Sequence, residues 1–502
     1  MQHVAFRPLR TAYSPLPTTP MLNILGGYQR TCGGITRRSL LQAGGAGLFG
    51  MSLPKLLAAE QASAINRPVR AKSVIFLMLF GGPSQLETFD LKPDAPDSIR
   101  GPFKPIASRT PGLLIGEHLP KLAACSDKYA VIRTMSHPYN DHSTGGHYIQ
   151  TGHPWHIPIG GGFNATEKDW PSMGSVVDFL QTRGAGEKLP DVPNYAFLPA
   201  LLGHLQAYST KLNRPGGYAG WLGNGYDPLA TDFRKRDDKD NPYFRSCTDE
   251  ELDFRIKGLA LEGDLTLDRL DNRRSLLDQF DDRRRGLDAG TPAVADYQQF
   301  RDRAMALVAS ERTRGALDVR REPAALRDRY GRHLFGQATM VARRLVEAGT
   351  RFVTVAWDTP NGYSWDSHQN SEDVKHSLLP GLDQTLSALL EDLEQRGLLD
   401  ETLVVCLGEM GRTPRANAVW GRNHWSTLFP AVLAGAGIRG GTVHGRSDKD
   451  AAFPQDRPTS PADLAATIYH AMGIDPHARI ADPQGRPVGL VDEGTPLVSL
   501  FG

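Results

Sequence analysis

Cysteine is scarce in this chain, which has four cysteines among 502 residues and no Cys-x-x-Cys pair. Cys32 lies in the N-terminal region, so Cys125, Cys247 and Cys406 remain as an odd and widely spaced set. Such a set argues against a disulfide framework and against a thiolate zinc site. We therefore expect buried free thiols, with at most one disulfide.

The chain also lacks a large excess of charge of either sign. Lys and Arg number 57 against 56 Asp and Glu, which gives +1 at pH 7. Nothing in this balance favours binding to nucleic acid or to an anionic membrane surface. No apolar run of membrane-spanning length follows residue 64, so we expect no stable membrane span in the mature protein. Any binding of a ligand must therefore depend on a local site and not on the overall charge.

The N-terminal region has the order of a twin-arginine export signal. An Arg-Arg pair at 37–38 precedes a weakly apolar run, and Ala-Ser-Ala follows at 62–64. Paired arginines, a short apolar stretch and an Ala-x-Ala cleavage site are the three parts of such a signal in their usual order. We expect residues 1–64 to hold this signal, with Met1 or Met21 as the start, and the mature protein to be periplasmic or secreted.

Continuous apolar runs predict buried strands of a parallel sheet at 73–80, 352–357, 402–407 and 429–434. Between the second and third runs, residues 378–396 carry leucines at helical spacing before a glycine that ends the helix. Strand, helix and strand in this order form a βαβ unit. We expect an α/β fold with a doubly wound, mostly parallel sheet flanked by helices.

Residues 65–502 are expected to form one domain with a charged helical insertion at about 230–347, where Arg and Asp dominate. An anion-binding surface is possible there, but the balanced signs favour a salt-bridged, solvated helical face. Glycine turns at 160–162 and 215–217 have three tryptophans nearby, at positions 155, 170 and 221. They predict a loop-rich region near the entrance of a site.

Polar residues follow the predicted strands, where ligands collect in an open parallel sheet. Asp366 and His368 follow the second strand, Glu409 follows the third, and His424 lies just before the fourth. Two carboxylates and two imidazoles suit a divalent ion such as zinc, manganese or magnesium. An isolated surface His or Asp is usually only solvated, so their joint placement is what indicates a metal site.

The segment 136–147 is dense in hydroxyls and imidazoles. A Ser or Thr at a helix start there could act as a nucleophile beside a base or a metal. The alternative is a turn capped by its own hydroxyls. Arg412 and Arg422 could each clamp an oxyanion, or each could pair with a nearby carboxylate.

Six motifs carry a resemblance to the DUF1501 family: Gly-Gly-Pro-Ser-x-x-x-Thr-Phe-Asp at 81–90, Gly-Glu-His-Leu-Pro at 116–120, Trp-Asp-Ser-His at 365–368, Gly-Glu-Met-Gly-Arg-Thr-Pro at 408–414, Gly-Arg-Asn-His-Trp at 421–425 and Asp-Leu-Ala-Ala-Thr-Ile-Tyr-His at 463–470. The resemblance covers roughly Ser73 to Phe501. It implies export by a twin-arginine signal and a fold related to the alkaline phosphatase and sulfatase superfamily. Members of that superfamily use a hydroxyl or formylglycine nucleophile and one or two divalent metals at the strand ends.

The resemblance implies which residues of this chain correspond to the superfamily's metal ligands, although not every ligand has a counterpart. Asp366 and His368 resemble its Asp…His pair, and His424 resembles its later metal-binding His. Glu409 stands where a metal-binding Asp is usual. Two glycines replace the ligand Asp that usually follows the first strand, so Glu87 or Asp90 would have to substitute for it; of the two, we take Asp90 as the candidate ligand.

The resemblance also implies a place for the nucleophile. Thr-Gly at 151–152 resembles the pair that follows the nucleophile helix, which places the nucleophile at His142 or Ser143. No Cys-x-Pro-x-Arg sequence exists, so formylglycine chemistry is not implied. Ser143, or else Thr144, would attack the ester while the metal and Arg412 hold its oxyanion.

The resulting expectation is an exported metal-dependent hydrolase of phosphate or sulfate esters. Its cofactor would be a divalent metal, either zinc, manganese or calcium. Its partner would be a small-molecule or glycan ester substrate, and nucleic acid is not expected. The alternative is a catalytically degenerate binding or scaffold protein that keeps the alkaline phosphatase-like cleft.

Overall fold

The computed structural model describes residues 69–157, 164–184, 191–206, 212–256, 300–301, 303–307, 310–359, 365–369 and 374–502. The expected export signal lies outside these residues, as do the glycine turn at 160–162 and residues 257–299 of the charged stretch. Among the described residues, no helix has both the length and the apolar character needed to cross a membrane.

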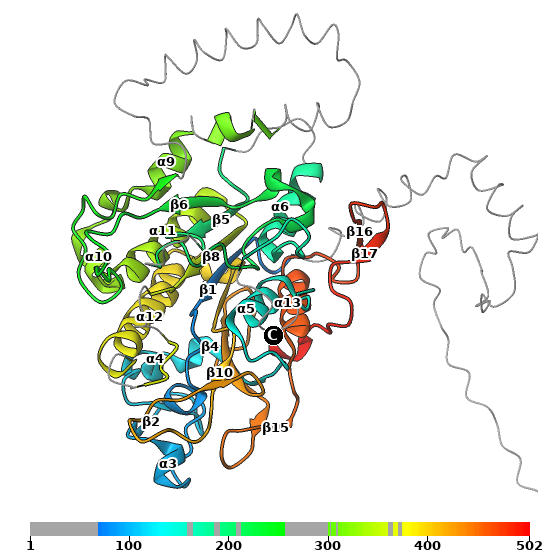
Figure 1. Cartoon of the computed structure of the whole chain (residues 1–502). Helices are drawn as coiled ribbons and strands as arrows, with labels where there is room; N and C mark the ends of the chain where they lie inside the picture. Colours follow the sequence, from blue (N-terminus) through cyan, green and yellow to red (C-terminus); the bar gives the residue numbers. More distant parts are fainter. Residues whose placement is uncertain are drawn as a thin grey trace, which may run out of the picture. The chain divides into compact units, whose positions relative to one another are not determined.

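A nine-stranded sheet forms the centre of the described chain (Figure 1). Its strands, in spatial order, are β13 (Val443–His444), β4 (Tyr129–Met135), β12 (Phe429–Ala434), β9 (Thr402–Leu407), β1 (Ser73–Met78), β8 (Phe352–Ala356), β5 (Tyr195–Leu198), β6 (Leu229–Asp232) and β7 (Arg255–Ile256). Strand β1 lies in the middle and pairs in parallel with β8 and β9, with Val74 opposite both Phe352 and Leu403. The sheet is therefore mostly parallel, as predicted.

The prediction of a fourth parallel strand at 429–434 is wrong in one respect. Strand β12 has the predicted bounds, but it runs antiparallel to both β4 and β9. A strand that is buried on both faces is apolar in either direction, so the run of residues does not encode its orientation.

Side chains of β1 alternate between two apolar layers. Ile75 and Leu77 pack with one cluster, and Phe76 and Met78 pack with another. Because both faces of the strand are covered, its sequence is continuously apolar rather than alternating.

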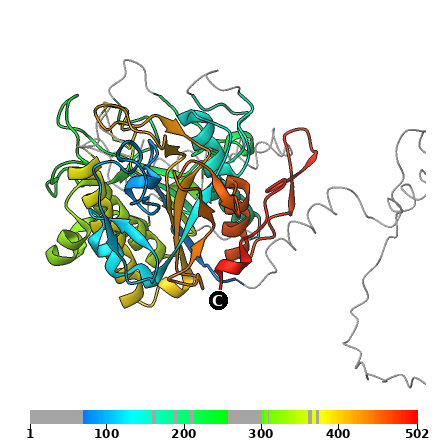
Figure 2. The same cartoon turned by 90° about the horizontal axis from the view of Figure 1, so that it is seen from below.

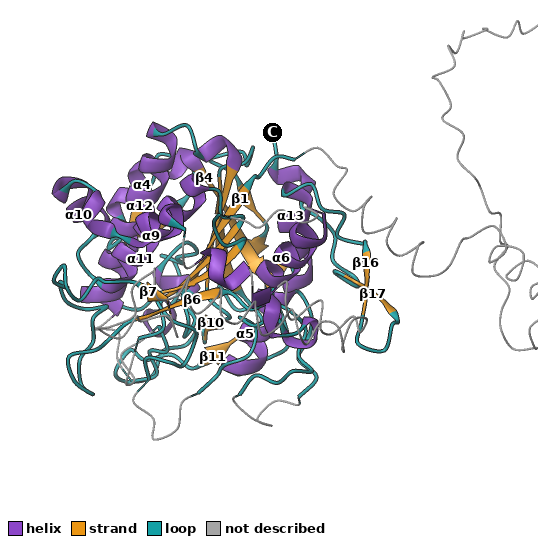
Figure 3. Ribbon diagram, turned by 90° about the horizontal axis from the view of Figure 1, so that it is seen from above, coloured by secondary structure: helices purple, strands orange, loops and turns teal. Residues whose placement is uncertain are grey.

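Helices cover both faces of the sheet. One face carries α4 (Pro120–Ala124), α11 (Leu334–Ala348) and α12 (Leu379–Gln395), and the other carries α5 (His142–Thr151), α6 (Met173–Gly184) and α13 (Pro461–Ala471). The two layers lie on opposite sides of the strands in views from below (Figure 2) and from above (Figure 3). This arrangement is the expected doubly wound fold.

Part of the charged range expected as an insertion belongs to the core. Helix α11 contacts β8 and β1 and buries most of its side chains. Two shorter helices, α9 (Glu311–Leu317) and α10 (Ala324–Tyr330), pack against it. An insertion remains a prediction for residues 257–299, which lie outside the described chain.

Besides several single-turn 3-10 helices and one π-helix (Val374–Leu378), the described chain has further short helices and strands. They are α3 (Asp97–Arg100) and four two-stranded pairs: β2 (Pro105–Ala107) with β3 (Leu114–Gly116), β10 (Gly411–Arg412) with β11 (His424–Trp425), β14 (Arg446–Ser447) with β15 (Pro454–Asp456), and β16 (Arg479–Ala481) with β17 (Pro487–Gly489).

The three cysteines of the described chain are buried free thiols, as predicted. Burial raises the pKa of the Cys125 thiol to about 12 and that of Cys247 to about 11. Such thiols stay protonated and unreactive.

The sheet brings several connections to one edge. Strands β1, β4, β8 and β9 run in the same direction, so the segments that follow them meet where these strands end. The reversed strand β12 begins at this same edge. The segment before β12 therefore joins the segments after the other four strands.

Candidate metal centre

Asp366 lies at the centre of a cluster of imidazoles at this edge. Its Oδ1 atom is 2.8 Å from Nε2 of His368 and 3.1 Å from Nε2 of His424. Its Oδ2 atom is 3.2 Å from Nε2 of His142. Ligand atoms of His142, Asp366 and His424 all lie within 4.8 Å of one another, and Nε2 of His368 is 3.0 Å from that of His424. Three imidazole nitrogens thus converge on one carboxylate.

The other nitrogen of each imidazole is held by an oxygen acceptor. The Nδ1–acceptor pairs are His142 with Glu409 Oε1 at 2.5 Å, His424 with the Asn140 carbonyl at 2.9 Å, and His368 with Asn423 Oδ1 at 2.9 Å. Because these oxygens only accept, each Nδ1 carries the proton and each Nε2 of a neutral ring presents a lone pair. Such hydrogen bonds are usual behind metal-ligating histidines.

This donor set fits a divalent cation. Lone pairs aimed at a carboxylate repel it unless protons or a cation lie between them. At a Zn–N distance of about 2.0–2.1 Å, tetrahedral geometry separates two nitrogen ligands by about 3.3 Å. The 3.0 Å between His368 Nε2 and His424 Nε2 is close to that separation.

In the protein without a cation, protons balance the cluster. Burial lowers the pKa of His142, but its hydrogen bonds with Asp366 and Glu409 outweigh this effect and raise the pKa to about 9. Burial raises the pKa of Asp366, but hydrogen bonds with His142 and His424 and the charge of Arg412 hold it far below its usual range. A cation would therefore have to displace a proton from His142.

Glu409 lies behind His142 rather than among the converging atoms. Its carboxylate is fully buried and accepts the backbone N–H of Gly81 at 2.9 and 3.1 Å. We expected Glu409 as a metal ligand and His142 as a catalytic residue. The structure instead places His142 among the candidate ligands and gives Glu409 the role of holding it.

The turn after β1 requires a glycine at this point. Gly81 has a φ of 115°, and a Cβ atom there would lie 2.6 Å from the backbone nitrogen of Asp366. Only glycine, which has no Cβ atom, allows the turn to lie this close to the segment that carries Asp366.

Arg412 is fully buried and bonded within the protein. It donates to Asp366 Oδ1 at 2.6 Å, to the Gly82 carbonyl at 3.0 Å and, with a shorter contact, to the Gly81 carbonyl. Pairing of β10 with β11 sets Arg412 opposite His424. Arg412 therefore positions Asp366, which is the carboxylate pairing that the sequence left open for it and not the oxyanion clamp.

The second arginine, Arg422, pairs with the buried Glu87 at 2.9 Å, which is the carboxylate pairing left open by the sequence. Asp90 is also engaged elsewhere. It lies 3.0 Å from Lys92 and 3.5 Å from Arg133, so cations of the protein itself neutralise it. Asp90 is not part of the group around Asp366.

The expected nucleophiles lie in the first turn of α5. Asp141 caps this helix and accepts the backbone N–H of Thr144 at 2.9 Å. The side chains of Ser143 and Thr144 are 2% and 1% exposed, and neither hydroxyl has a hydrogen-bond partner within the described chain. His142 is more exposed, and it is the residue that faces the cluster.

Two acceptors in the site were not predicted. Asn423 had a signal, because it directly precedes His424 in the Gly-Arg-Asn-His-Trp motif. Asn140 contributes its backbone carbonyl, a group that every residue possesses, so no sequence signal could have identified it.

Solved structures of esterases and sulfatases resemble this chain distantly. The phosphonate monoester hydrolase SpPMH from Silicibacter pomeroyi is 13% identical, with a TM-score of 0.35, and the match covers 85% of this chain and 76% of that one. The PsFucS1 sulfatase from Pseudoalteromonas sp. is 11% identical, with a TM-score of 0.35 and coverage of 84% and 72%. A mutant of the alkaline phosphatase PafA is 10% identical, with a TM-score of 0.39 and coverage of 87% and 100%. Similarities this weak say nothing about the activity of this chain.

None of the curated proteins matches the chain. A protein family does match, over residues 71–501, and its description is "Protein of unknown function (DUF1501)". That match includes the whole sheet and every residue of the cluster around Asp366. The chain therefore belongs to the DUF1501 family.

Proposed function

We propose that this chain is an exported, metal-dependent hydrolase of phosphate or sulfate esters. The observation that carries the proposal is the convergence of three imidazole Nε2 atoms on Asp366. His142, Asp366 and His424 would hold the cation, with His368 beside them. When bound, the cation would act as a Lewis acid that draws electron density from an ester oxygen. Imidazole ligands favour zinc over manganese or calcium, which prefer oxygen ligands.

The protein's own residues orient this centre. Glu409 keeps the proton on Nδ1 of His142 and so turns Nε2 toward Asp366, while Arg412 fixes the carboxylate of Asp366. His368 has 38% of its side chain exposed, the largest fraction in the cluster. An ester would therefore approach from the side of His368.

Ser143 remains the proposed nucleophile. It follows His142 directly at the start of α5, and its Oγ is not engaged by a hydrogen bond from the described chain. Thr144 is the weaker candidate, since its backbone is anchored by Asp141. With Ser143 only 2% exposed, attack requires the start of α5 to open toward the substrate.

The same burial favours a second candidate, a cation-dependent binding protein without turnover. Both candidate nucleophiles, Ser143 and Thr144, are buried, and so is Arg412, so none of the groups predicted to act on an ester faces solvent. Such a protein would keep the metal and lose the reaction.

Metal content and turnover, measured together, test the proposal. We expect wild-type protein purified without chelator to hold a stoichiometric cation and to hydrolyse p-nitrophenyl phosphate or p-nitrophenyl sulfate. His424→Ala should lose both properties, whereas His477→Ala, at an exposed position away from the cluster, should keep both. Ser143→Ala should keep the metal and lose turnover.

Three outcomes distinguish the candidates. A protein without stoichiometric metal contradicts the metal centre itself. Metal without turnover on either ester favours the binding protein. Full turnover in Ser143→Ala removes this residue as nucleophile and leaves the metal centre standing.

A further inference from the structure

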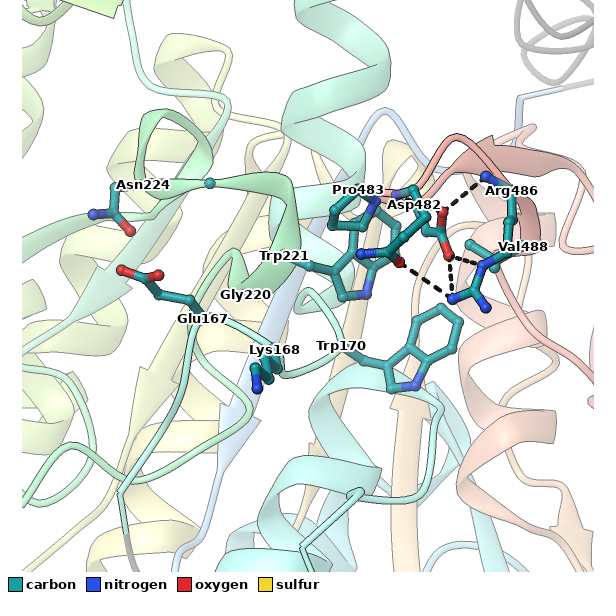
Figure 4. A pocket seen from close by; sticks show the side chains of 12 residues that line it. Glu167, Lys168, Trp170, Gly220, Trp221, Asn224, Asp482, Pro483, Arg486 and Val488 are labelled. Atoms are coloured by element: carbon teal, nitrogen blue, oxygen red, sulfur yellow. Dashed lines mark hydrogen bonds and ion pairs between the residues drawn. The ribbon is translucent and has the colours of Figure 1, made fainter.

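A second site lies in the loop-rich region that carries the tryptophans. A pocket of about 750 Å³ opens between the loop at 164–172, the turn at 220–224 and the tip of the β16–β17 hairpin. Figure 4 shows the indole rings of Trp170 and Trp221 next to each other in this pocket. Their centroids are 5.6 Å apart and their planes are inclined by 70°.

Trp170 is fixed in place from behind. The imidazole of His153 stacks on its indole with centroids 3.7 Å apart and planes inclined by 3°. His153 is itself held, with Nε2 2.8 Å from the Leu490 carbonyl and Nδ1 3.4 Å from Asp492. One face of the indole is thus occupied by protein, and the ring is pre-oriented before any ligand arrives. A rigid aromatic surface loses little conformational entropy on binding.

Polar side chains surround the two rings, and their charges balance. Glu167 and Lys168 lie on one side of the pocket, and Asp482 and Arg486 of the hairpin lie on the other (Figure 4). Arg486 pairs with Asp482 at 2.7 Å and is 73% exposed, so it keeps donors for a ligand. Two acids and two bases leave no net charge, which disfavours a polyanion or a phosphate as the ligand.

We propose that this pocket binds a neutral pyranose unit of a glycan chain. The apolar C–H face of a pyranose ring stacks on an indole, while its hydroxyls both donate and accept hydrogen bonds at the ring edge. Trp170 and Trp221 supply the stacking surfaces. Glu167 supplies an acceptor, and Asn224 and Arg486 supply donors. An apolar ligand would leave these polar groups unpaired, which costs affinity.

The glycan site is distinct from the metal centre. His142 begins α5, whereas His153, which supports Trp170, follows the end of this helix. A helix of ten residues is about 15 Å long, so the two sites are separated by roughly this distance. Binding at the tryptophans therefore does not depend on the proposed function, and it would hold a glycan chain apart from the reacting group.

Titration with defined neutral glycans tests the inference. Chitohexaose, cellohexaose and mannohexaose would be added to the full chain, with binding followed by calorimetry and by tryptophan fluorescence. We expect at least one of them to bind, with an affinity that chelator leaves unchanged. Trp170→Ala and Trp221→Ala should each weaken this binding by about tenfold or more. Trp420→Ala removes an exposed tryptophan that does not line the pocket and should bind as wild type does.

Several outcomes would overturn the inference. One is that none of the three glycans binds wild-type protein at concentrations up to about 5 mM, which would exclude a dissociation constant in the low millimolar range. Others are undiminished binding in the Trp170→Ala/Trp221→Ala double variant, or an equal loss in Trp420→Ala. If the tryptophan variants do not fold, Glu167→Gln with Arg486→Ala changes only exposed side chains and should still weaken binding several-fold. Unchanged binding there would equally refute the site.

Discussion

Glu409 accepts hydrogen bonds from Nδ1–H of His142 and from the backbone N–H of Gly81, so its carboxylate is engaged before any cation binds. A carboxylate in this position fixes the imidazole and makes its free nitrogen a better electron donor. Gln at the same position would keep an oxygen acceptor but lose the charge. The two roles, orientation and charge, can therefore be separated by one substitution.

Glu409→Gln should weaken zinc binding by about 10–100-fold, in the range usual for residues that hold a ligand from behind. Competition with a chromophoric chelator at constant pH measures this change. Glu493→Gln, at an exposed position, is the matched control and should leave the affinity unchanged. Wild-type affinity in Glu409→Gln would show that its charge plays no part in the site.

The sequence identified residues of the candidate metal centre better than it predicted their individual roles. Asp366 and His424 were found because they adjoin predicted strands, where ligands collect. The role of His142 depends on Glu409, which lies 267 residues away, and no local pattern encodes that contact. Arg412 was expected to clamp an oxyanion because of its planar guanidinium group, or else to pair with a carboxylate; here carbonyls and Asp366 satisfy it inside the protein.

Among the elements, β1, β8 and β9 were predictable because both faces of each strand are buried and their sequences are therefore continuously apolar. Strand β4 was missed, since Arg133 interrupts its apolar run. Strand β5 has only four residues, too few to show a period. The direction of β12 depends on its neighbours and not on its composition.

The glycine turn after β1 can be tested by adding a single methyl group. Left-handed backbone strain alone costs about 1–2 kcal/mol when Ala replaces Gly. Gly81→Ala should lower the free energy of unfolding by more than this, because its Cβ would also press on the backbone of Asp366. Gly112→Ala is the control, with a φ of 80° and no atom within 4 Å of its Cβ. Urea unfolding of both variants gives the comparison. Equal losses would mean that the close approach at Gly81 contributes nothing.

Helix α11 begins with a pH-sensitive cap. The half-buried His333 accepts the backbone N–H of Gly336, and loss of solvent around its ring lowers its pKa to about 4. The folded state thus binds a proton less readily than the unfolded chain, whose histidines titrate near 6.5. This residue's contribution to stability is full above pH 6.5 and is lost as the pH falls toward 4, by at most about 1.4 kcal/mol per pH unit.

His333→Asn should therefore reduce the loss of stability in acid. Asn also caps helices but does not titrate in this range. Urea midpoints of metal-free protein at about pH 7.5 and pH 5 would be compared with those of wild type and of His477→Asn, an exposed histidine. If the variant and wild type lose the same stability between these pH values, His333 does not set the acid sensitivity.

For the whole molecule, the α/β class followed from the order of strands and helices, whereas the export signal and its cleavage site remain predictions that rest on residues 36–64 alone. Replacing Arg37 and Arg38 with Lys should leave the precursor in the cytoplasm, because the export machinery reads the arginine pair itself. Fractionation with N-terminal sequencing measures the effect. Exported wild-type protein that still begins at Met1 or Met21 would contradict cleavage after Ala64.

The reversed strand β12 has a consequence for how this protein can vary. In an all-parallel sheet, each connection must leave the site edge and cross back before the next strand begins. Residues 408–428 instead pass from β9 to β12 without leaving that edge, and they carry Glu409, Arg412 and His424 together. A single contiguous replacement of this stretch could supply new ligands or a new rim to the centre while every crossover helix, and with them the fold, stays as it is.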